Sequence, residues 1–328
     1  MRPRSNDVFS FRLADQEMGL STVAGIGTTV LICVAALVLW LKGRRAKSME
    51  EIEAELRKKF TAHDGITLYD NGSSPCAKRV RITLKEKGIK HHVVLVNLST
   101  RENRHPSYLA INPQGKVPAM VVRSIEGIPD CCLYESNAIT EWLDEQFPWT
   151  TQLYPLDPWE RAQVKLWQRW EGAMAEDFWP LMYANVLGPV NRFLYSRDTY
   201  KKMFSNEKDP YHFAKMMKTY DGELLSPREM KRNAIHLYKW LNILESALEN
   251  KTYICGNTFT TADISVVPRT LMYPITGLLE TKEEQNRYPN VMRYLRNVGS
   301  RPSFHEPSVV SLNLVRWLPW SLIEWEQN

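Results

Sequence analysis

The pattern of hydrophobic and polar positions changes sharply near the start of the chain. Residues 19–41 are 23 consecutive uncharged residues, GLSTVAGIGTTVLICVAALVLWL, and residues 48–60 then mix acidic, basic and apolar side chains at helical spacing. A helix of that length extends about 34 Å, enough to cross a hydrocarbon layer about 30 Å thick. The pattern predicts a single N-terminal transmembrane helix at residues 19–41, followed by a charged stalk at residues 42–64.

The charge around this segment argues against its alternatives, a cleaved signal peptide and a buried core helix. A signal peptide has a shorter apolar run with positive charge before it, whereas four cations follow the run here: Lys42, Arg44, Arg45 and Lys47. Because the positive flank stays in the cytosol, we expect residues 1–18 to form a short non-cytosolic tail and residues 42–328 to lie in the cytosol. Both the endoplasmic reticulum and the mitochondrial outer membrane satisfy this rule.

Residues 65–149 alternate short apolar runs with helical patterns. ITLY, HHVVLV, VPAMVV and CCLY predict four strands, while residues 75–87 and 136–147 have helical period and residues 102–110 form a weaker helix. The order strand-helix-strand-helix-strand-strand-helix is that of a small α/β domain of thioredoxin-like fold.

After residue 149 the strand signals stop, so residues 150–328 are predicted to form an all-α domain. Four segments have helical period: residues 157–186, 227–249, 261–276 and 289–298. Breaks at Gly188-Pro189, Asp209-Pro210 and Ser226-Pro227 predict an insertion at about residues 187–226, with one or two short helices of its own.

Composition narrows the function classes. The chain of 328 residues is 44% hydrophobic and 24% charged, which is typical of a folded protein. Its net charge of +5 comes mostly from the four cations after the apolar run, so a nucleic-acid partner is not expected. Five cysteines without metal-ligand spacing predict neither a disulfide framework nor a metal site, and favour a reduced compartment.

Two Ser-containing segments mark predicted helix N-termini. Ser74 before Pro75 is a typical N-cap and first-turn pair, and the positive field there would also stabilise a thiolate. Glu135 and Ser136 precede the last helix of the α/β domain, and Ser136 is expected to be its N-cap. There the Glu135 carboxylate could receive an ammonium group while Ser136 receives a carboxylate. Taken singly, each motif also fits an ordinary helix cap.

The segment Asn112-Pro113-Gln114-Gly115-Lys116-Val117-Pro118 leads into the third predicted strand. A cis peptide at Pro118 would leave the Val117 backbone free to pair with an extended ligand. An ordinary junction between a loop and a strand is the alternative.

Together these motifs, in this order, resemble the glutathione transferase family: a strand followed by SP and a helix, NPxGKVP, and ESxAI before a helix. The resemblance continues in the α-domain, where Thr260–Asp263 form a capping box flanked by Phe259 and Ile264. It covers about residues 65–186 and 227–305 and implies a serine-type glutathione transferase, with glutathione as co-substrate.

The resemblance also implies roles for individual residues. Glu135 and Ser136 would hold the γ-glutamyl end, Val117 beside Pro118 the cysteinyl backbone, and Lys116 the glycyl carboxylate. Ser74 would be the catalytic hydroxyl, with Ser73 and Cys76 as alternatives; Cys76 is expected to pack against the sheet. A small hydrophobic electrophile would lie near four aromatic residues that also suit a core: Trp167, Trp170, Phe178 and Tyr183.

Three functions remain open at this stage. The first is a membrane-anchored transferase that activates the glutathione thiolate, with a homodimer as the family's usual assembly. The second is an inactive membrane adaptor resembling ganglioside-induced differentiation-associated proteins, which also combine a membrane segment with an insertion in the α-domain. The third is a glutathione-dependent dehalogenase, isomerase or thiol redox enzyme.

Overall fold

The structure, a computed structural model, describes residues 48–205, 207 and 209–305, and divides into two units, Met1–Glu55 and Leu56–Asn328. The predicted tail and transmembrane helix lie outside the described residues. Within the described ranges, no helix is long and apolar enough to cross a membrane. The predicted stalk contains helix α2 (Met49–Lys59), where Ser48 and Glu51 exchange hydrogen bonds at the N-terminus.

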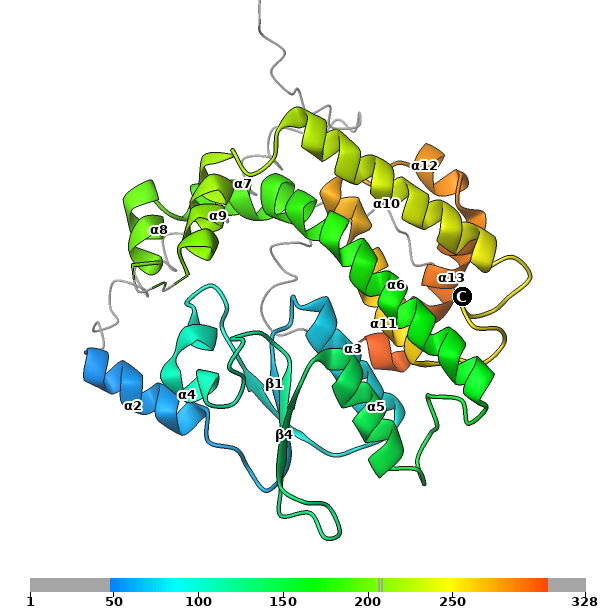
Figure 1. Cartoon of the computed structure of the whole chain (residues 1–328), viewed down its shortest axis with the longest axis horizontal. Helices are drawn as coiled ribbons and strands as arrows, with labels where there is room; N and C mark the ends of the chain where they lie inside the picture. The colour runs from blue at the N-terminus through cyan, green and yellow to red at the C-terminus, as the bar shows by residue number, and fades with distance from the viewer. Residues whose placement is uncertain (1–47, 206, 208, 306–328) are drawn as a thin grey trace, which may run out of the picture. The chain divides into compact units, whose positions relative to one another are not determined.

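A mixed four-stranded sheet forms the first part of the larger unit (Figure 1), in the order β2-β1-β3-β4. The strands are β1 (Gly65–Asp70), β2 (His92–Leu95), β3 (Ala119–Arg123) and β4 (Cys131–Tyr134). β1 runs parallel to β2 and antiparallel to β3, and β3 is antiparallel to β4. This is the predicted thioredoxin-like arrangement.

Alternate residues of the strands serve opposite faces of this sheet, as the two-residue period of a strand requires. Ile66 and Leu68 pack against α3 (Pro75–Glu86) and α5 (Ser136–Gln146). Tyr69 faces the other way, toward α4 (Pro106–Leu109), which follows the short helix η1 (Glu102–Arg104). The hydroxyl group of Tyr69 donates to the carbonyl oxygen of Phe60 at 3.0 Å, so this tyrosine has a structural role.

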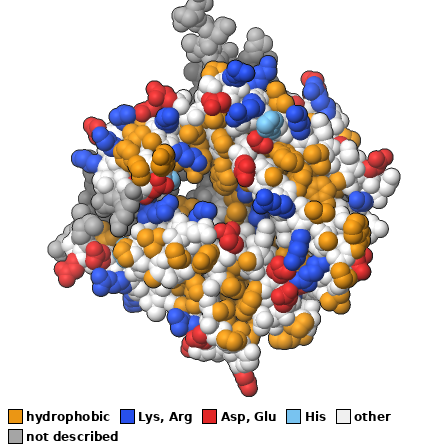
Figure 2. Space-filling view, viewed as in Figure 1, with side chains coloured by type: hydrophobic (Ala, Val, Ile, Leu, Met, Phe, Trp, Pro, Cys, Tyr) orange, Lys and Arg blue, Asp and Glu red, His pale blue; other side chains and the backbone are white. Residues whose placement is uncertain are grey.

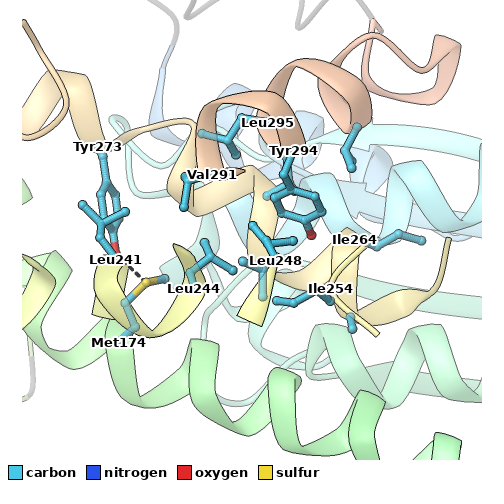
Figure 3. Close-up of a cluster of buried hydrophobic side chains, with 14 of the residues drawn as sticks. Met174, Leu241, Leu244, Leu248, Ile254, Ile264, Tyr273, Val291, Tyr294 and Leu295 are labelled. Atoms are coloured by element: carbon cyan, nitrogen blue, oxygen red, sulfur yellow. Dashed lines mark hydrogen bonds between the residues drawn. The ribbon is translucent and has the colours of Figure 1, made fainter. Parts of the chain in front are cut away.

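The second part of the unit is helical, as predicted. Its elements are α6 (Pro158–Met182), η2 (Tyr183–Leu187), α7 (Gly188–Leu194), α8 (Arg197–Met203), α9 (Pro210–Asp221), α10 (Pro227–Ala247), α11 (Thr261–Thr270), η3 (Tyr273–Thr276), α12 (Lys282–Asn286), α13 (Pro289–Gly299) and η4 (Pro302–Phe304). Figure 3 shows the core, where Leu241, Val291 and Tyr294 from α10 and α13 face Ile264 of α11 and Met174 of α6.

The insertion differs from the expectation of one or two short helices, because it contains three: α7, α8 and α9. Gly188-Pro189 does not interrupt the helix either. α6 continues through the π-helix η2 into α7, and Pro189 falls in the first turn of α7, where a missing N–H costs little. A Cβ at Gly188 would lie 2.5 Å from the carbonyl oxygen of Thr219, so α7 and α9 pack with their backbones in close contact.

The predicted capping box begins α11. The hydroxyl group of Thr260 accepts from the N–H of Ala262 at 3.3 Å, and the Asp263 carboxylate accepts from the N–H of Thr260 at 2.8 Å. Asp263 also accepts from the hydroxyl group of Tyr294 and the N–H of Ile254. The box therefore anchors α11 to α13 and to the preceding loop.

Helix α3 joins the two parts of the unit. Ile82 of α3 packs in the hydrophobic core of the helical domain, whereas Val80 and Leu84 of the same helix pack against the sheet. At the end of α3, Arg301 makes a two-pronged ion pair with Glu86, at 2.9 and 2.7 Å. Whatever is held at the N-terminus of α3 is thus positioned by both domains.

Candidate functional site

The register of the sheet brings the three sequence motifs to one edge. Tyr69 near the end of β1 pairs with Ala119 at the start of β3, and Ala119 pairs with Tyr134 at the end of β4. The segment from Asn71 to Ser74 leaves that edge, Val117-Pro118 enters it, and Glu135 leaves it. Motifs separated by about sixty residues in the sequence therefore begin or end on neighbouring strands.

Ser74 is the N-cap of α3, as predicted. Its Oγ accepts from the N–H of Ala77 at 3.2 Å, and Pro75 occupies the first turn. The side chain is half-buried, and one accepted bond leaves its own proton free to donate. Ser73, in contrast, is exposed, and its Oγ donates to Oδ1 of Asn71 at 2.6 Å. Of the two serines, only Ser74 therefore has its hydroxyl group at the N-terminus of α3 with its proton uncommitted.

The loop before β3 is held by side chains from the preceding segment. The Val117-Pro118 peptide is cis. Tyr108 and Asn112 both donate to the carbonyl oxygen of Lys116, at 2.6 and 2.7 Å. Pro118 is buried and Lys116 exposed, and within the described part of the chain no hydrogen bond uses the Val117 backbone. The Val117 backbone is thus left available for a ligand, while the side chains of Tyr108 and Asn112 hold the neighbouring Lys116 carbonyl group in place.

The structure corrects the expectation that Ser136 is the N-cap of α5. Glu135 takes the N-cap position, with φ of 74° and no capping bond from its side chain, and Ser136 is the first residue of the helix. The turn therefore rotates Ser136 inward, where its Oγ accepts from Nη1 of Arg79 at 3.2 Å. Glu135 remains exposed and Ser136 is buried, so of these two side chains only the Glu135 carboxylate faces solvent.

Beneath this edge lies a buried ionic group that sequence analysis missed. Glu171 of α6 pairs with Arg79 of α3 and with Arg269 of α11, and all three side chains are at most 4% exposed. Burial opposes the charge of Arg79, but the Glu171 carboxylate outweighs it and raises the pKa of Arg79. The sequence gives no local signal for this group, because Arg79 is one of several basic residues of α3 and its partners lie on α6 and α11.

Cys76 does not pack against the sheet as expected. Its Sγ lies 3.9 Å from Nη2 of Arg269, so the thiol faces the helical domain. The adjacent Ala77 is fully buried instead, and a helix places consecutive residues about 100° apart, so Cys76 and Ala77 face different sides of α3.

One lysine of α3 has a pKa well below the usual value of a lysine side chain. Lys78 lies with its Nζ 5.5 Å from the centre of the Phe304 ring. Burial, together with the charge of Arg81, lowers the pKa of Lys78 to about 8. An amine that titrates so near neutral pH makes the stability of this helix dependent on pH.

The four candidate aromatic residues occupy different surroundings. Phe178 is fully buried and stacks on Tyr273 with ring centres 5.9 Å apart, so it belongs to the core. Trp167 and Trp170 are partly buried and contact each other edge to face. Tyr183 lies in η2 beside the insertion, with Nζ of Lys215 over its ring at 4.5 Å. Three of the four therefore keep some exposed surface.

Fold and site together define a thioredoxin-like domain joined to an all-α domain, with three polar loops at the sheet edge. The glutathione S-transferase N-terminal domain family matches residues 73–146, and the C-terminal domain family matches residues 226–302. Glutathione S-transferase F13 of Arabidopsis thaliana is 30% identical over 242 residues, 72% of this chain and 92% of the relative. The chain belongs to the glutathione S-transferase family.

Solved structures show the same fold. β-Etherase LigF from Sphingobium sp. strain SYK-6 is similar with a TM-score of 0.63 and 22% identity, over 73% of this chain and 96% of that one. A glutathione transferase family member from Pseudomonas fluorescens pf-5, with two glutathione bound, has a TM-score of 0.58 and 22% identity, over 76% and 95%. The segment between the two family matches, residues 147–225, contains α6 and the insertion.

Proposed function

We propose that the protein is a membrane-anchored glutathione transferase that activates the thiolate of glutathione for attack on a hydrophobic electrophile. The observation that carries this proposal is the convergence of Ser74, Val117 and Glu135 on neighbouring strand ends. Glutathione as the co-substrate is supported by family membership and by the glutathione bound in the similar Pseudomonas protein.

The bound tripeptide would lie extended along this edge. Its γ-glutamyl ammonium group would pair with the exposed Glu135 carboxylate, and its γ-glutamyl carboxylate would meet the first N–H groups of α5 at Ser136. Its cysteinyl backbone would pair with the open edge of Val117. Lys116, exposed beside it, would attract the glycyl carboxylate.

In this arrangement Ser74 would act on the sulfur atom. Its free O–H would donate to the thiolate, while the N-terminal field of α3 adds positive potential. A fall of two units in the thiol pKa raises the thiolate fraction at pH 7 from a few per cent to roughly three-quarters. The sulfur then bonds to the electrophilic carbon, and the leaving group departs with its electron pair.

The electrophile would approach from the helical side. Trp167, Trp170 and Tyr183 keep exposed surface and offer apolar contact, whereas Phe178 supports them from the core. Dehalogenation and isomerisation begin with the same activated thiolate and would use the same residues.

Residues 19–41 would anchor this enzyme in the endoplasmic reticulum or the mitochondrial outer membrane, with residues 42–328 in the cytosol. The uncharged run and the four cations after it support this proposal. Alkaline extraction of membranes, followed by protease treatment of sealed vesicles, tests it: the chain should stay with the lipid, and its body should be digested.

The test of function is glutathione binding to the full chain in detergent micelles, measured by calorimetry. The parent should bind with micromolar to low-millimolar affinity. Glu135→Ala should lose binding, whereas Ser74→Ala should keep binding and lose turnover with a model electrophile such as 1-chloro-2,4-dinitrobenzene. Glu126→Ala, in an exposed turn of the same domain, serves as the matched control.

Other results would select the remaining functions. A parent that binds no glutathione would favour the membrane adaptor, for which the three-helix insertion is the supporting observation. Turnover that survives Ser74→Ala but is lost in Cys76→Ser would favour thiol redox chemistry at the sulfur atom beside Arg269.

A further inference from the structure

The insertion is packed against the sheet domain, so its outer surface is a fixed part of the molecule. Arg101, just before η1, donates to the carbonyl oxygen of Met203 at 2.9 Å and pairs with Glu207 at 2.5 Å. Its guanidinium group also lies 4.2 Å from the centre of the Phe204 ring. These contacts hold the segment between α8 and α9 beside the loops that follow β2.

Helix α7 packs on the rest of the insertion through one face. Nη1 of Arg192 donates to the carbonyl oxygen of Tyr220 at 2.6 Å, and Nδ2 of Asn191 donates to the hydroxyl group of Tyr200 at 3.4 Å. Gly188 lies in close contact with the backbone of α9. Because consecutive residues of a helix are about 100° apart, positions 188, 191 and 192 share this inner face.

The opposite face of α7 is apolar and exposed. It carries Val190, Phe193 and Leu194, whose side chains are 38%, 87% and 50% exposed. Residues at this spacing are neighbours on a helix surface, and we call these three the α7 patch. Figure 2 shows hydrophobic side chains gathered over the insertion, at the upper left of the view, with lysine and arginine side chains beside them. A helix face in water is normally polar, so a contiguous apolar face is typical of a contact surface.

The chain around the α7 patch is basic. Residues 188–203 contain one acidic residue, Asp198, and four basic ones: Arg192, Arg197, Lys201 and Lys202. Arg197 pairs with Asp221 at 2.8 Å, whereas Lys201 and Lys202 are exposed and form no ion pair with another described residue. Apolar side chains flanked by cations suit the surface of a membrane, where anionic headgroups lie above hydrocarbon.

A second copy of the chain fits the α7 patch less well than a lipid surface does. A two-fold contact would bring the same basic residues of both copies together, and like charges oppose such a contact. The patch consists of three side chains on a helix of seven residues, whereas a stable dimer buries about 800 Å² on each partner. An anionic lipid surface pairs with the cations and needs no larger patch.

The proposed anchor lowers the affinity that a lipid contact needs. Six residues, 42–47, separate the predicted transmembrane helix from Ser48, and six extended residues span at most about 20 Å. The body would therefore stay close to the bilayer, where a high effective concentration favours even a weak contact.

The α7 patch is also continuous with the helical side of the candidate site. The π-helix η2 contains Tyr183, one of the residues proposed to contact the electrophile, and leads directly into α7. The distance along the helix from Tyr183 to Phe193 is about 15 Å. A lipid contact at Phe193 would therefore bring the electrophile side of the site close to molecules dissolved in the bilayer.

We propose that the α7 patch inserts into the surface of the bilayer that holds the anchor, so that the enzyme takes hydrophobic electrophiles from the lipid. This inference rests on the proposed function and adds the source of the substrate. Phe193 and Leu194 enter the boundary between headgroups and acyl chains, while Lys201 and Lys202 pair with anionic headgroups. The insertion thus sets the orientation of the enzyme on its membrane.

The test places a photoreactive side chain on the α7 patch of the full chain, reconstituted in vesicles of phosphatidylcholine and phosphatidylserine. Phe193→p-benzoylphenylalanine is irradiated, and its adducts are identified by mass spectrometry. The ketone carbon bonds to a carbon of the contacted molecule, and the hydrogen atom of that C–H bond moves to the ketone oxygen. The matched control is Trp159→p-benzoylphenylalanine, because Trp159 is 72% exposed at the opposite end of α6, a helix of 25 residues and about 38 Å.

We expect lipid adducts at Phe193 to exceed those at Trp159 at least about five-fold, because the α7 patch lies in the lipid. The double variant Lys201→Gln with Lys202→Gln should reduce the Phe193 adduct about three-fold or more in these vesicles, and should have no effect in phosphatidylcholine alone. Lys231→Gln, exposed on α10, should leave the adduct unchanged.

A second measurement tests the source of the substrate. The electrophiles 4-chloro-3-nitrobenzoate and its decyl ester share one reacting centre, from which the thiolate displaces chloride as the S–C bond forms, but only the ester partitions into lipid. In vesicles, Phe193→Ser should lower kcat/KM for the ester about three-fold and leave kcat/KM for the acid unchanged. The Phe193 side chain is outside the proposed catalytic and glutathione-binding residues, so a loss with both compounds is not expected.

Three results would overturn the proposal: equal lipid adducts at Phe193 and Trp159, a Phe193 adduct with a second copy of the chain in place of lipid, or an unchanged ratio of ester to acid in Phe193→Ser. The second result would assign the α7 patch to self-association. Photo-crosslinking requires neither glutathione nor turnover. Absence of glutathione binding would therefore contradict the transferase, and release by alkaline extraction would contradict the anchor, independently of the adduct at Phe193.

Discussion

Arg79 of α3 and Glu171 of α6 form an ion pair with side chains only 4% and 2% exposed, directly behind the Ser136 hydroxyl group. Arg269 of α11 binds the same carboxylate. One acid thus pairs with two buried cations at the junction of the sheet and helical domains, and the three side chains together carry a net charge of +1. Removing it would leave charge that neither solvent nor another described acid compensates.

We therefore expect Glu171→Gln to reduce the free energy of unfolding by about 3–5 kcal/mol, the typical cost of an uncompensated buried charge. Urea denaturation of the full chain, followed by intrinsic tryptophan fluorescence, measures this loss. Glu176→Gln, exposed on the same helix, should stay within about 0.5 kcal/mol of the parent. A loss below about 1 kcal/mol in Glu171→Gln would contradict the burial of this charge.

Substitutions of Ser74 separate its capping role from its proposed catalytic role. Ser74→Ala removes the acceptor for the N–H of Ala77 and should cost about 1 kcal/mol of stability. Ser74→Asp keeps a good N-cap and should recover most of that stability, yet it lacks a hydroxyl proton for the thiolate and should remain inactive. Full turnover in Ser74→Asp would show that the Ser74 hydroxyl is not catalytic.

The pKa of about 8 at Lys78 predicts a pH-dependent stability. Between pH 8 and pH 10.5 the unfolded state keeps the Lys78 proton and the native state loses it, so stability rises with pH in this window. At pH 7 the native state carries the penalty of the buried charge, and Lys78→Met should be more stable by about 2 kcal/mol. The gap should close by about pH 10.5.

Urea denaturation at pH 7, 8.5 and 10 measures the gap between parent and Lys78→Met. Lys90→Met, at an exposed position after α3, controls for the general effect of removing a lysine. A gap that stays constant across this range would mean that Lys78 does not titrate within it.

Arg101 is expected to control the mobility of the insertion. Arg101→Gln removes its pair with Glu207 and its contact with Phe204, so amide hydrogen exchange in α8 and α9 should accelerate about five- to ten-fold. Arg197→Gln breaks a more exposed pair inside the insertion, with Asp221, and should have a smaller effect. Equal exchange in the two variants would show that Arg101 does not restrain this segment.

Local chemistry predicted most of the architecture. Each strand of the sheet and each long helix appears where the period of apolar residues indicated it, and the Thr260–Asp263 box begins α11 because capping involves neighbours only. Ser74 was predictable as an N-cap for the same reason. The N-terminal anchor lies outside the described residues and remains a prediction, as do the roles of the site residues in binding and catalysis.

The missed features depend on contacts between distant segments. Nothing near Arg79 reveals that its partner is Glu171, because the two meet only when α6 packs on α3. The inward turn of Ser136 follows from the positive φ of Glu135, which is unusual for a residue with a side chain. Gly188-Pro189 resembled a helix break, yet proline in a first turn is compatible with the continuous path from α6 into α7.

That continuous path has a consequence for how chains of this kind diversify. A segment that grows from the end of a helix can gain or lose turns without opening the layers beneath it. Here the growth carries Lys215 of α9 over the Tyr183 ring and brings Glu207 to Arg101 of the sheet domain. Changes in the insertion can therefore alter the surface around Tyr183, while the sheet edge and α3, which carry the candidate glutathione-binding residues, stay unchanged.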